Sequence, residues 1–188
     1  MVDWCAREID AAAMRLILLR HAKSEKAVPG MSDHARSLNL RGRRDIALIG
    51  AYMAHHGLAP DLAAVSPARR TRETWECLLA AFATAPPVVF DERLYNARGE
   101  AIVAAIKQIG STAHTLLVLG HNPGLHDCAR LLIASGDVEA RERLNESLPT
   151  SALVVIDFAG EDWRKLHQQG GRIEHFVSPR MLADADRV

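Results

Sequence analysis

The sequence RLILLRHAKS occupies residues 15–24 and decides the first element of the fold. Its apolar run, Leu16–Leu19, contains no polar residue, which is typical of a strand buried on both faces. An arginine and a histidine, Arg20 and His21, follow the run at once. The segment therefore predicts an inner strand of a parallel sheet that brings two polar side chains to one edge.

The same pattern recurs along the chain. Apolar runs alternate with segments whose apolar residues repeat at helical spacing. The predicted strands are Leu16–Leu19, Leu62–Val65, Val88–Phe90 and Leu116–Leu119, and the helical stripes lie within 39–57, 75–82, 102–109 and 125–132. Such alternation builds a parallel sheet with helices on both faces. We therefore expect an α/β fold, a three-layer α/β/α sandwich around a mostly parallel sheet.

Two further strands and one helix add detail to this expectation. The strands Ala152–Phe158 and Ile173–Val177 have no helix between them, so we expect one of them to pair antiparallel at an edge of the sheet. In the first helix Asn39 is the expected N-cap, and Gly50 indicates a close packing contact rather than a filled core position.

The length of 188 residues suits one domain, which we place at residues 14–188. Residues 1–13 form a polar, alanine-rich extension, interpreted either as a loose or non-native chain end or as a short surface helix. Lys plus Arg and Asp plus Glu each number 23, and the resulting net charge of zero argues against a generally basic nucleic-acid-binding protein.

Cysteine content and hydropathy indicate a compartment. The three cysteines, Cys5, Cys77 and Cys128, are widely spaced and odd in number, which predicts neither a disulfide framework nor a zinc cluster. The apolar runs are far shorter than the roughly 20 residues that cross a membrane, and the charged N-terminal stretch does not resemble a secretory signal. We expect a cytoplasmic protein with no membrane contact.

Polar residues follow each predicted strand. They are Arg20 and His21, then Ser66 and Pro67 with Arg69, Arg70 and Arg72, then Asp91–Arg93, and finally the sequence GHNPG at 120–124. Ligands of open α/β sheets bind beyond the carboxyl ends of the strands. We therefore expect two histidines, several arginines and a carboxylate to meet at one edge of the sheet.

This set of side chains suits a phosphoryl group. Arginine presents a planar fork of donors that matches phosphate oxygens. Histidine titrates near neutral pH and acts as a nucleophile, and a carboxylate protonates a leaving atom. Asn122 and Pro123 are interpreted as the N-cap and first residue of a helix whose free amides favour an anion beside His121. Nothing in the set requires a metal.

Three motifs in this order resemble the histidine phosphatase, or phosphoglycerate mutase-like, superfamily. They are RHAKS at 20–24, Ser66-Pro67-x-x-Arg70-x-x-x-Thr74, and GHNPG at 120–124. The resemblance covers Met14–Pro179 and is strongest to the small SixA-type phosphohistidine phosphatases. It implies an α/β fold and phosphatase chemistry that needs no cofactor and no metal.

The resemblance also implies a role for individual residues. His21 is similar to the nucleophile that becomes phosphorylated, and Arg20 and Arg70 are similar to the arginines that hold the phosphoryl oxygens. His121 is similar to the second histidine of the pocket, which donates to the phosphoryl group. Glu92 falls on the acid of the larger members, at a place where small members vary.

Substrate contacts are expected beyond these groups, from Lys23, Ser24 and Asn122. Larger members of the family carry an insertion that roofs the site. Here only a few residues separate Tyr95 from the helical stripe that contains Ile102. The missing insertion implies an open, shallow cleft.

Several residues have a plainer interpretation. Arg69 and Arg72 are expected on the surface, Ser66 and Thr74 as cap or packing residues, and Glu92 equally as a surface residue paired with Arg93. The remaining histidines are read as structural or exposed. The basic cluster Arg36, Arg41, Arg43 and Arg44 indicates a solvated helix face or, alternatively, a docking site for an acidic partner.

The leading hypothesis is a phosphatase that hydrolyses a phosphomonoester or phosphoramidate through a phosphohistidine at His21. Its expected partner is a phosphorylated protein, with protein phosphohistidine first, or a small phospho-compound. A non-catalytic phosphate-recognition module is an alternative. A mutase is a further one, although it needs a closed site, and a zinc hydrolase another, although the histidines lack ligand spacing. Substrate and oligomeric state stay open.

Overall fold

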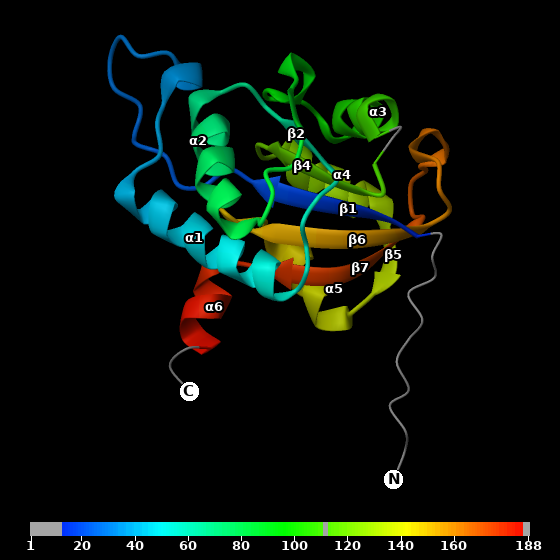
Figure 1. Ribbon diagram of the computed structural model, residues 1–188. Coiled ribbons are helices and arrows are strands. Elements are labelled where there is room, and N and C mark those ends of the chain that lie inside the picture. Colours follow the sequence, from blue (N-terminus) through cyan, green and yellow to red (C-terminus); the bar gives the residue numbers. More distant parts are fainter. Residues whose placement is uncertain (1–12, 111–112, 186–188) are drawn as a thin grey trace.

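The computed structural model describes residues 13–110 and 113–185. It contains a seven-stranded mixed sheet with the strand order β3-β2-β4-β1-β6-β7-β5 (Figure 1). The strands are β1 (Ala13–Arg20), β2 (Leu62–Val65), β3 (Val88–Phe90), β4 (Thr115–Gly120), β5 (Ile133–Gly136), β6 (Leu153–Ala159) and β7 (Gly171–Val177). The helices are α1 (Leu40–His55), α2 (Arg69–Leu78), α3 (Gly99–Ile109), α4 (Gly124–Leu132), α5 (Val138–Glu146) and α6 (Pro179–Ala185).

The predicted three-layer α/β architecture is confirmed. One face of the sheet packs against α3, α4 and α5, and the other packs against α1, α2 and α6. In β1, Leu16 and Leu18 join the first of these cores while Ile17 and Leu19 join the second, and all four are fully buried. Alternate side chains of an inner strand point to opposite faces, so an unbroken apolar run is required there.

The first four predicted strands pair in parallel, and their carboxyl ends align. Arg20 lies opposite Gly120, and Val65 lies between Leu119 on one side and Phe90 on the other. The residues that follow these strands therefore leave the sheet at the same edge. This register is what gathers the candidate site.

The position of the antiparallel strand differs from the prediction. β6 is antiparallel to both β1 and β7, and it lies inside the sheet rather than at an edge. The outer position is taken by β5, which pairs in parallel with β7. Because β5 has the sequence IASG, with only Ile133 buried, it carries no apolar run by which a strand is predicted.

The predicted N-cap and the predicted glycine contact are both found in α1. The Asn39 side chain accepts a hydrogen bond from the Gly42 backbone N–H at 2.8 Å, which makes Asn39 the N-cap. Gly50 is buried, and a Cβ placed there would lie 3.2 Å from Cβ of Ala81. Both predictions are confirmed.

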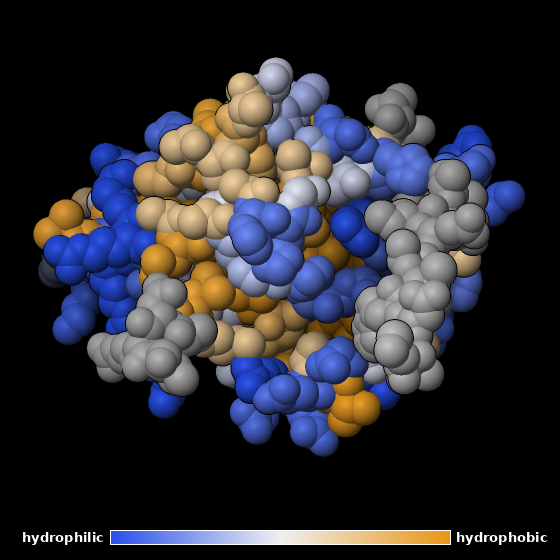
Figure 2. All heavy atoms as spheres, turned by 60° about the horizontal axis from the view of Figure 1, so that its bottom comes forward, coloured by the Kyte–Doolittle hydropathy of each residue, from blue (hydrophilic) through white to orange (hydrophobic). Residues whose placement is uncertain are grey.

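The predicted extension at residues 1–13 falls mostly outside the described residues, since β1 begins at Ala13. Within the described residues, no helix is long and apolar enough to cross a membrane. Cys77 and Cys128 are both free thiols. Figure 2 shows a face on which hydrophobic and hydrophilic residues are interspersed.

Candidate active site

His21 is held where β1 ends. Its backbone N–H donates to the carbonyl of Gly120 at 3.1 Å, which continues the pairing with β4 by one residue. The next amide, that of Ala22, donates to the Thr74 hydroxyl at 3.0 Å. Gly42 of α1 packs against the backbone of Lys23, and a Cβ on Gly42 would lie 2.2 Å from the Lys23 carbonyl oxygen. Strand, α2 and the start of α1 therefore fix the backbone around His21.

The imidazole of His21 is buried and neutral. Its Nδ1 donates to the carbonyl of Ala22 at 2.8 Å, so the lone pair of the neutral ring lies on Nε2. The ring is buried, with 9% of the residue exposed. Burial and the positive charges of Arg70 and Arg20 outweigh the opposing hydrogen bond to the Ala22 carbonyl and lower the pKa of His21 from 6.5 to about 4. At neutral pH the ring is therefore uncharged, with its single N–H proton on Nδ1.

His121 lies beside it, with the two ring centroids 5.1 Å apart. Its Nε2 is hydrogen-bonded to the Ser66 hydroxyl at 2.7 Å, and its Nδ1 is buried without a protein partner. Burial, together with the neighbouring His21 and Arg70, lowers the pKa of His121 to about 3. When the Ser66 hydroxyl donates to Nε2, the neutral ring carries its proton on Nδ1 and has one unused donor.

Arg20 and Asn122 share an acceptor at the edge of the site. The Arg20 guanidinium donates to the Leu148 carbonyl at 2.8 Å, and the Asn122 side-chain amide donates to the same oxygen at 2.8 Å. The prediction that Asn122 caps the next helix is wrong. The helix α4 begins at Gly124 with Pro123 as its N-cap residue, and the Asn122 side chain is turned toward Leu148 instead.

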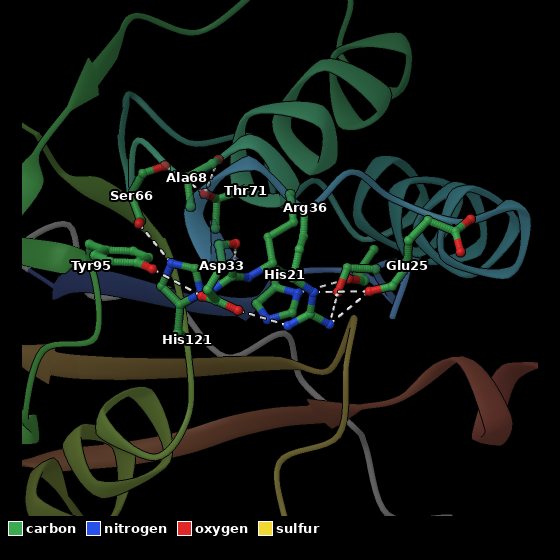
Figure 3. Close-up of polar contacts among 12 residues, drawn as sticks. His21, Glu25, Asp33, Arg36, Ser66, Ala68, Thr71, Tyr95 and His121 are labelled. Carbon is green, nitrogen blue, oxygen red and sulfur yellow. Dashed lines mark hydrogen bonds and ion pairs between the residues drawn. The ribbon is translucent and has the colours of Figure 1, made fainter. Parts of the chain in front are cut away.

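Arg70 enters from α2 and is buried, with 4% of the residue exposed. Its two terminal nitrogens donate to Asp33, one to the backbone carbonyl at 2.7 Å and one to the carboxylate at 3.0 Å. The same carboxylate accepts from Arg36 at 2.8 Å and from the Tyr95 hydroxyl at 3.0 Å. Figure 3 shows Asp33, Arg36 and Tyr95 arranged around His21 and His121.

These three residues and Ser66 were not predicted as site residues. Asp33 and Arg36 come from a polar stretch that has no periodicity, so the sequence alone gives no signal of where their side chains point. The hydrogen bond from Arg36, with those from Tyr95 and Arg70, lowers the pKa of Asp33 from 3.8 to about 2. The site therefore contains an ionised carboxylate among its arginines.

The buried side-chain atoms that have no partner in the described residues gather here. They are Nε of Arg20, Nδ1 of His121, Oδ1 of Asn122 and Oγ of Ser151. Ser151 belongs to the same place, because its backbone N–H donates to the carbonyls of Arg20 and His21 at 3.2 Å. Buried polar groups are normally satisfied. Oδ1 of Asn122 is an acceptor, but the other three atoms can donate, and unused donors beside a neutral imidazole and two arginines suit an anion with several acceptor oxygens.

The other predicted site residues are placed differently. Ser24 is buried and accepts from Arg36 at 2.9 Å. Lys23 and Glu92 are exposed, and among the described residues neither side chain has a hydrogen bond or ion pair to the histidines or to Arg20 or Arg70. Arg69 pairs with Glu73, and its side chain is 60% exposed.

The described residues contain no group of three or more histidine, cysteine, aspartate or glutamate side chains that would hold a metal ion. The connection that follows Tyr95 is also short, since α3 begins at Gly99. A neutral imidazole, two arginines and unused hydrogen-bond donors thus lie together at the carboxyl edge of the sheet. This arrangement can bind an oxyanion and attack it.

Comparisons with known proteins agree with this geometry. Residues 16–101 match the model of the histidine phosphatase superfamily, branch 1. An uncharacterized protein of Mycobacterium tuberculosis is 35% identical over 165 residues, which cover 86% of this chain and all of that protein. An uncharacterized chloroplastic protein of Arabidopsis thaliana is 28% identical, with 94% of this chain and 83% of that protein covered.

Solved structures give the same relationship. The crystal structure of the candidate phosphohistidine phosphatase SixA from Agrobacterium tumefaciens has a TM-score of 0.74 and 30% sequence identity, and the match covers 88% of this chain and 98% of that one. The protein histidine phosphatase SixA complexed with tungstate has a TM-score of 0.68 at 19% identity, with 90% of this chain and 99% of that one covered.

Proposed function

Because the chain belongs to branch 1 of the histidine phosphatase superfamily, we propose that it is a phosphatase that transfers the phosphoryl group of its substrate to His21. The observation that carries this proposal is the state of the His21 ring. It is buried and neutral, with Nδ1 tied to the Ala22 carbonyl and Nε2 left as the nucleophilic nitrogen. Covalent catalysis by histidine needs this state.

The reaction proceeds by two displacements. Nε2 of His21 attacks phosphorus in line, a phosphorus–nitrogen bond forms, and the bond to the leaving group breaks while the leaving atom takes up a proton. Arg20 and Arg70 neutralise charge on the phosphoryl oxygens, and the Nδ1–H of His121 donates a hydrogen bond to one of them. Water then attacks the phosphorus of phospho-His21, the phosphorus–nitrogen bond breaks, and inorganic phosphate leaves with the ring neutral again.

The proposed substrate is a phosphohistidine on another protein. Two observations support this choice. The short connection between Tyr95 and α3 leaves no inserted domain over the site, so a bulky substrate meets no roof there. The structural relatives include phosphohistidine phosphatases of the SixA type, one of them 30% identical. The acid that protonates the leaving group stays a prediction at Glu92, which is exposed.

A substrate panel tests the function. We expect the enzyme, assayed with a metal chelator present, to release phosphate from a phosphohistidine peptide at least about tenfold faster, in kcat/KM, than from phosphoserine, a sugar phosphate or a nucleotide. The reason is that small substrates bind well in enclosed pockets, whereas an open site leaves room for a phosphorylated side chain carried by a protein. Good turnover of the small compounds without turnover of phosphohistidine would instead make this a metabolite phosphatase, and binding without turnover would make it a recognition module.

Asp33 gives a second test of the site. Its carboxylate accepts from one terminal nitrogen of Arg70, so the carboxylate and the phosphoryl group compete for one guanidinium. The Asp33→Asn variant keeps the shape and removes the charge. We expect the inhibition constant of tungstate, used as a phosphate-like probe, to fall roughly tenfold, since a like charge leaves the site.

The matched control is Asp184→Asn, which removes an aspartate from the exposed pair with Arg180. We expect the control to bind tungstate like the wild type. If Asp33→Asn binds tungstate less tightly than the wild type, the carboxylate orders Arg70 for the ligand instead of competing with it.

A further inference from the structure

A polar cavity lies beside α4, the helix that begins three residues after His121. Its volume is about 760 Å³, and its lining includes Arg98, Arg130 and Arg141. These arginines come from three places, the N-cap of α3, the helix α4 and the helix α5. We refer to this space as the arginine cavity.

With Arg44 of α1, these three are the arginines of the described residues whose guanidinium groups have neither an ion pair nor a hydrogen bond to another described residue. Arginine takes part in every ion pair found there, from Arg15 with Asp157 to Arg180 with Asp184. Arg98, Arg130 and Arg141 take part in none, and none of their guanidinium groups donates a hydrogen bond to a described residue. Three unpaired guanidinium groups around one cavity favour an anionic ligand.

The other residues that line the arginine cavity indicate which class of anion it binds. Glu100 and Asp127 also line the cavity, together with the amides of Asn145, Gln168 and Gln169. A compact polyphosphate concentrates negative charge and would be repelled by these two carboxylates. An extended peptide places its carboxylates at intervals and offers backbone groups to the amides. The mixed lining therefore suits an acidic peptide segment better.

The cavity is close enough to the candidate active site for one peptide to reach both. Pro123 lines the cavity and follows His121 by two residues, while the His121 ring is 5.1 Å from that of His21. Two residues of chain span at most about 7.6 Å. A peptide with its phosphorylated residue at His21 reaches the cavity within a few positions, because an extended chain advances about 3.3 Å per residue.

We propose that the arginine cavity binds carboxylate side chains of the protein substrate a few residues from its phosphohistidine. This inference rests on the proposed function for the identity of the phosphorylated residue. The binding surface itself rests on Arg98, Arg130 and Arg141.

Peptide binding tests the cavity without catalysis. The probe is a fluorescein-labelled peptide with an unphosphorylated histidine flanked by glutamates, compared with the same peptide carrying glutamines, and the readout is fluorescence anisotropy. The variant is Arg98→Gln/Arg130→Gln/Arg141→Gln, in which all three residues are exposed. The matched control is Arg44→Gln, an exposed arginine of α1 that has no ion pair.

We expect the Kd of the glutamate peptide to rise at least about tenfold in the triple variant and to stay unchanged in Arg44→Gln. The glutamine peptide should bind weakly to every protein. Equal binding of the glutamate peptide to wild type and triple variant overturns the proposal. So does binding of tripolyphosphate, dependent on the same arginines, with no binding of the glutamate peptide, since the cavity then takes a small polyphosphate.

Phosphorylated forms of the two peptides separate this inference from the proposed function. We expect kcat/KM to favour the glutamate peptide about tenfold in the wild type and not in the triple variant, with unchanged turnover of phosphoramidate itself. If neither peptide is hydrolysed but the glutamate peptide still needs the arginines to bind, the function fails and the cavity stands. If both peptides are hydrolysed equally well by the wild type, the function stands and the cavity fails.

Discussion

The His21→Ala variant is expected to release no measurable phosphate from a phosphohistidine peptide, a loss of roughly 10⁴-fold or more. The variant has no nitrogen that attacks phosphorus. Arg20, Arg70 and His121 remain, and they bind an anion without supplying a covalent route. Binding of tungstate should therefore survive while turnover disappears. The separation of binding from turnover distinguishes a lost nucleophile from a collapsed site.

A matched histidine controls for nonspecific damage. His167 is exposed, and the only hydrogen bond of its ring within the described residues is to the Gln168 carbonyl, so His167→Ala should keep wild-type activity. Thermal unfolding of both variants checks that the fold is intact, since His21 is buried and its replacement leaves a gap. Near wild-type phosphate release from folded His21→Ala protein would remove His21 from the mechanism.

The second large effect is expected at Arg70. The Arg70→Ala variant should lose about 10²- to 10³-fold in kcat/KM, the usual cost of removing one oriented donor to a transition-state oxyanion. Arg70 is buried, so water does not replace its fork of donors. Arg70→Lys keeps the charge but not the fork, and we expect it to recover only part of the loss.

Arg69 supplies the control for this experiment. It is adjacent in the same helix, and its exposed guanidinium pairs with Glu73 at 2.7 Å. Glu73 is buried but keeps its ion pair with Arg43 and its hydrogen bond from the Leu38 backbone N–H, so Arg69→Ala should be nearly silent. Equal losses in Arg69→Ala and Arg70→Ala would show that the effect comes from α2 as a whole and not from a phosphoryl contact. The two variants are compared by steady-state kinetics on one peptide.

Much of the site was predictable because parallel strands end at a common edge. Arg20 is the last residue of β1 and His21 follows it, and His121 follows β4, the neighbour of β1 in the sheet. Apolar runs located these strands, and the two histidine rings do meet, with centroids 5.1 Å apart. The prediction of Arg70 also depended on the motif Ser66-Pro67-x-x-Arg70. Three arginines lie in the first turn of α2, and helical spacing alone does not show which of them is buried.

The unpredicted parts depend on tertiary contacts that leave no local pattern. Asp33 reaches Arg70 and Tyr95 across 37 and 62 residues of sequence, from a polar stretch with no periodicity. Asn122 was predicted to be a helix N-cap because asparagine followed by proline is typical of one. Its side-chain amide instead donates a hydrogen bond to the Leu148 carbonyl. The edge of the sheet beside β7 is likewise formed by β5, a strand too short and polar to predict.

The central claim, that His21 carries the phosphoryl group, is tested most directly by trapping the intermediate. Wild-type protein is mixed with a ³²P-phosphohistidine peptide, quenched within milliseconds in alkali, digested and mapped by mass spectrometry. The account predicts a base-stable, acid-labile phosphate on His21 and none in the His21→Ala protein. A label on another residue, or rapid turnover with no label on the protein at any time, would contradict it.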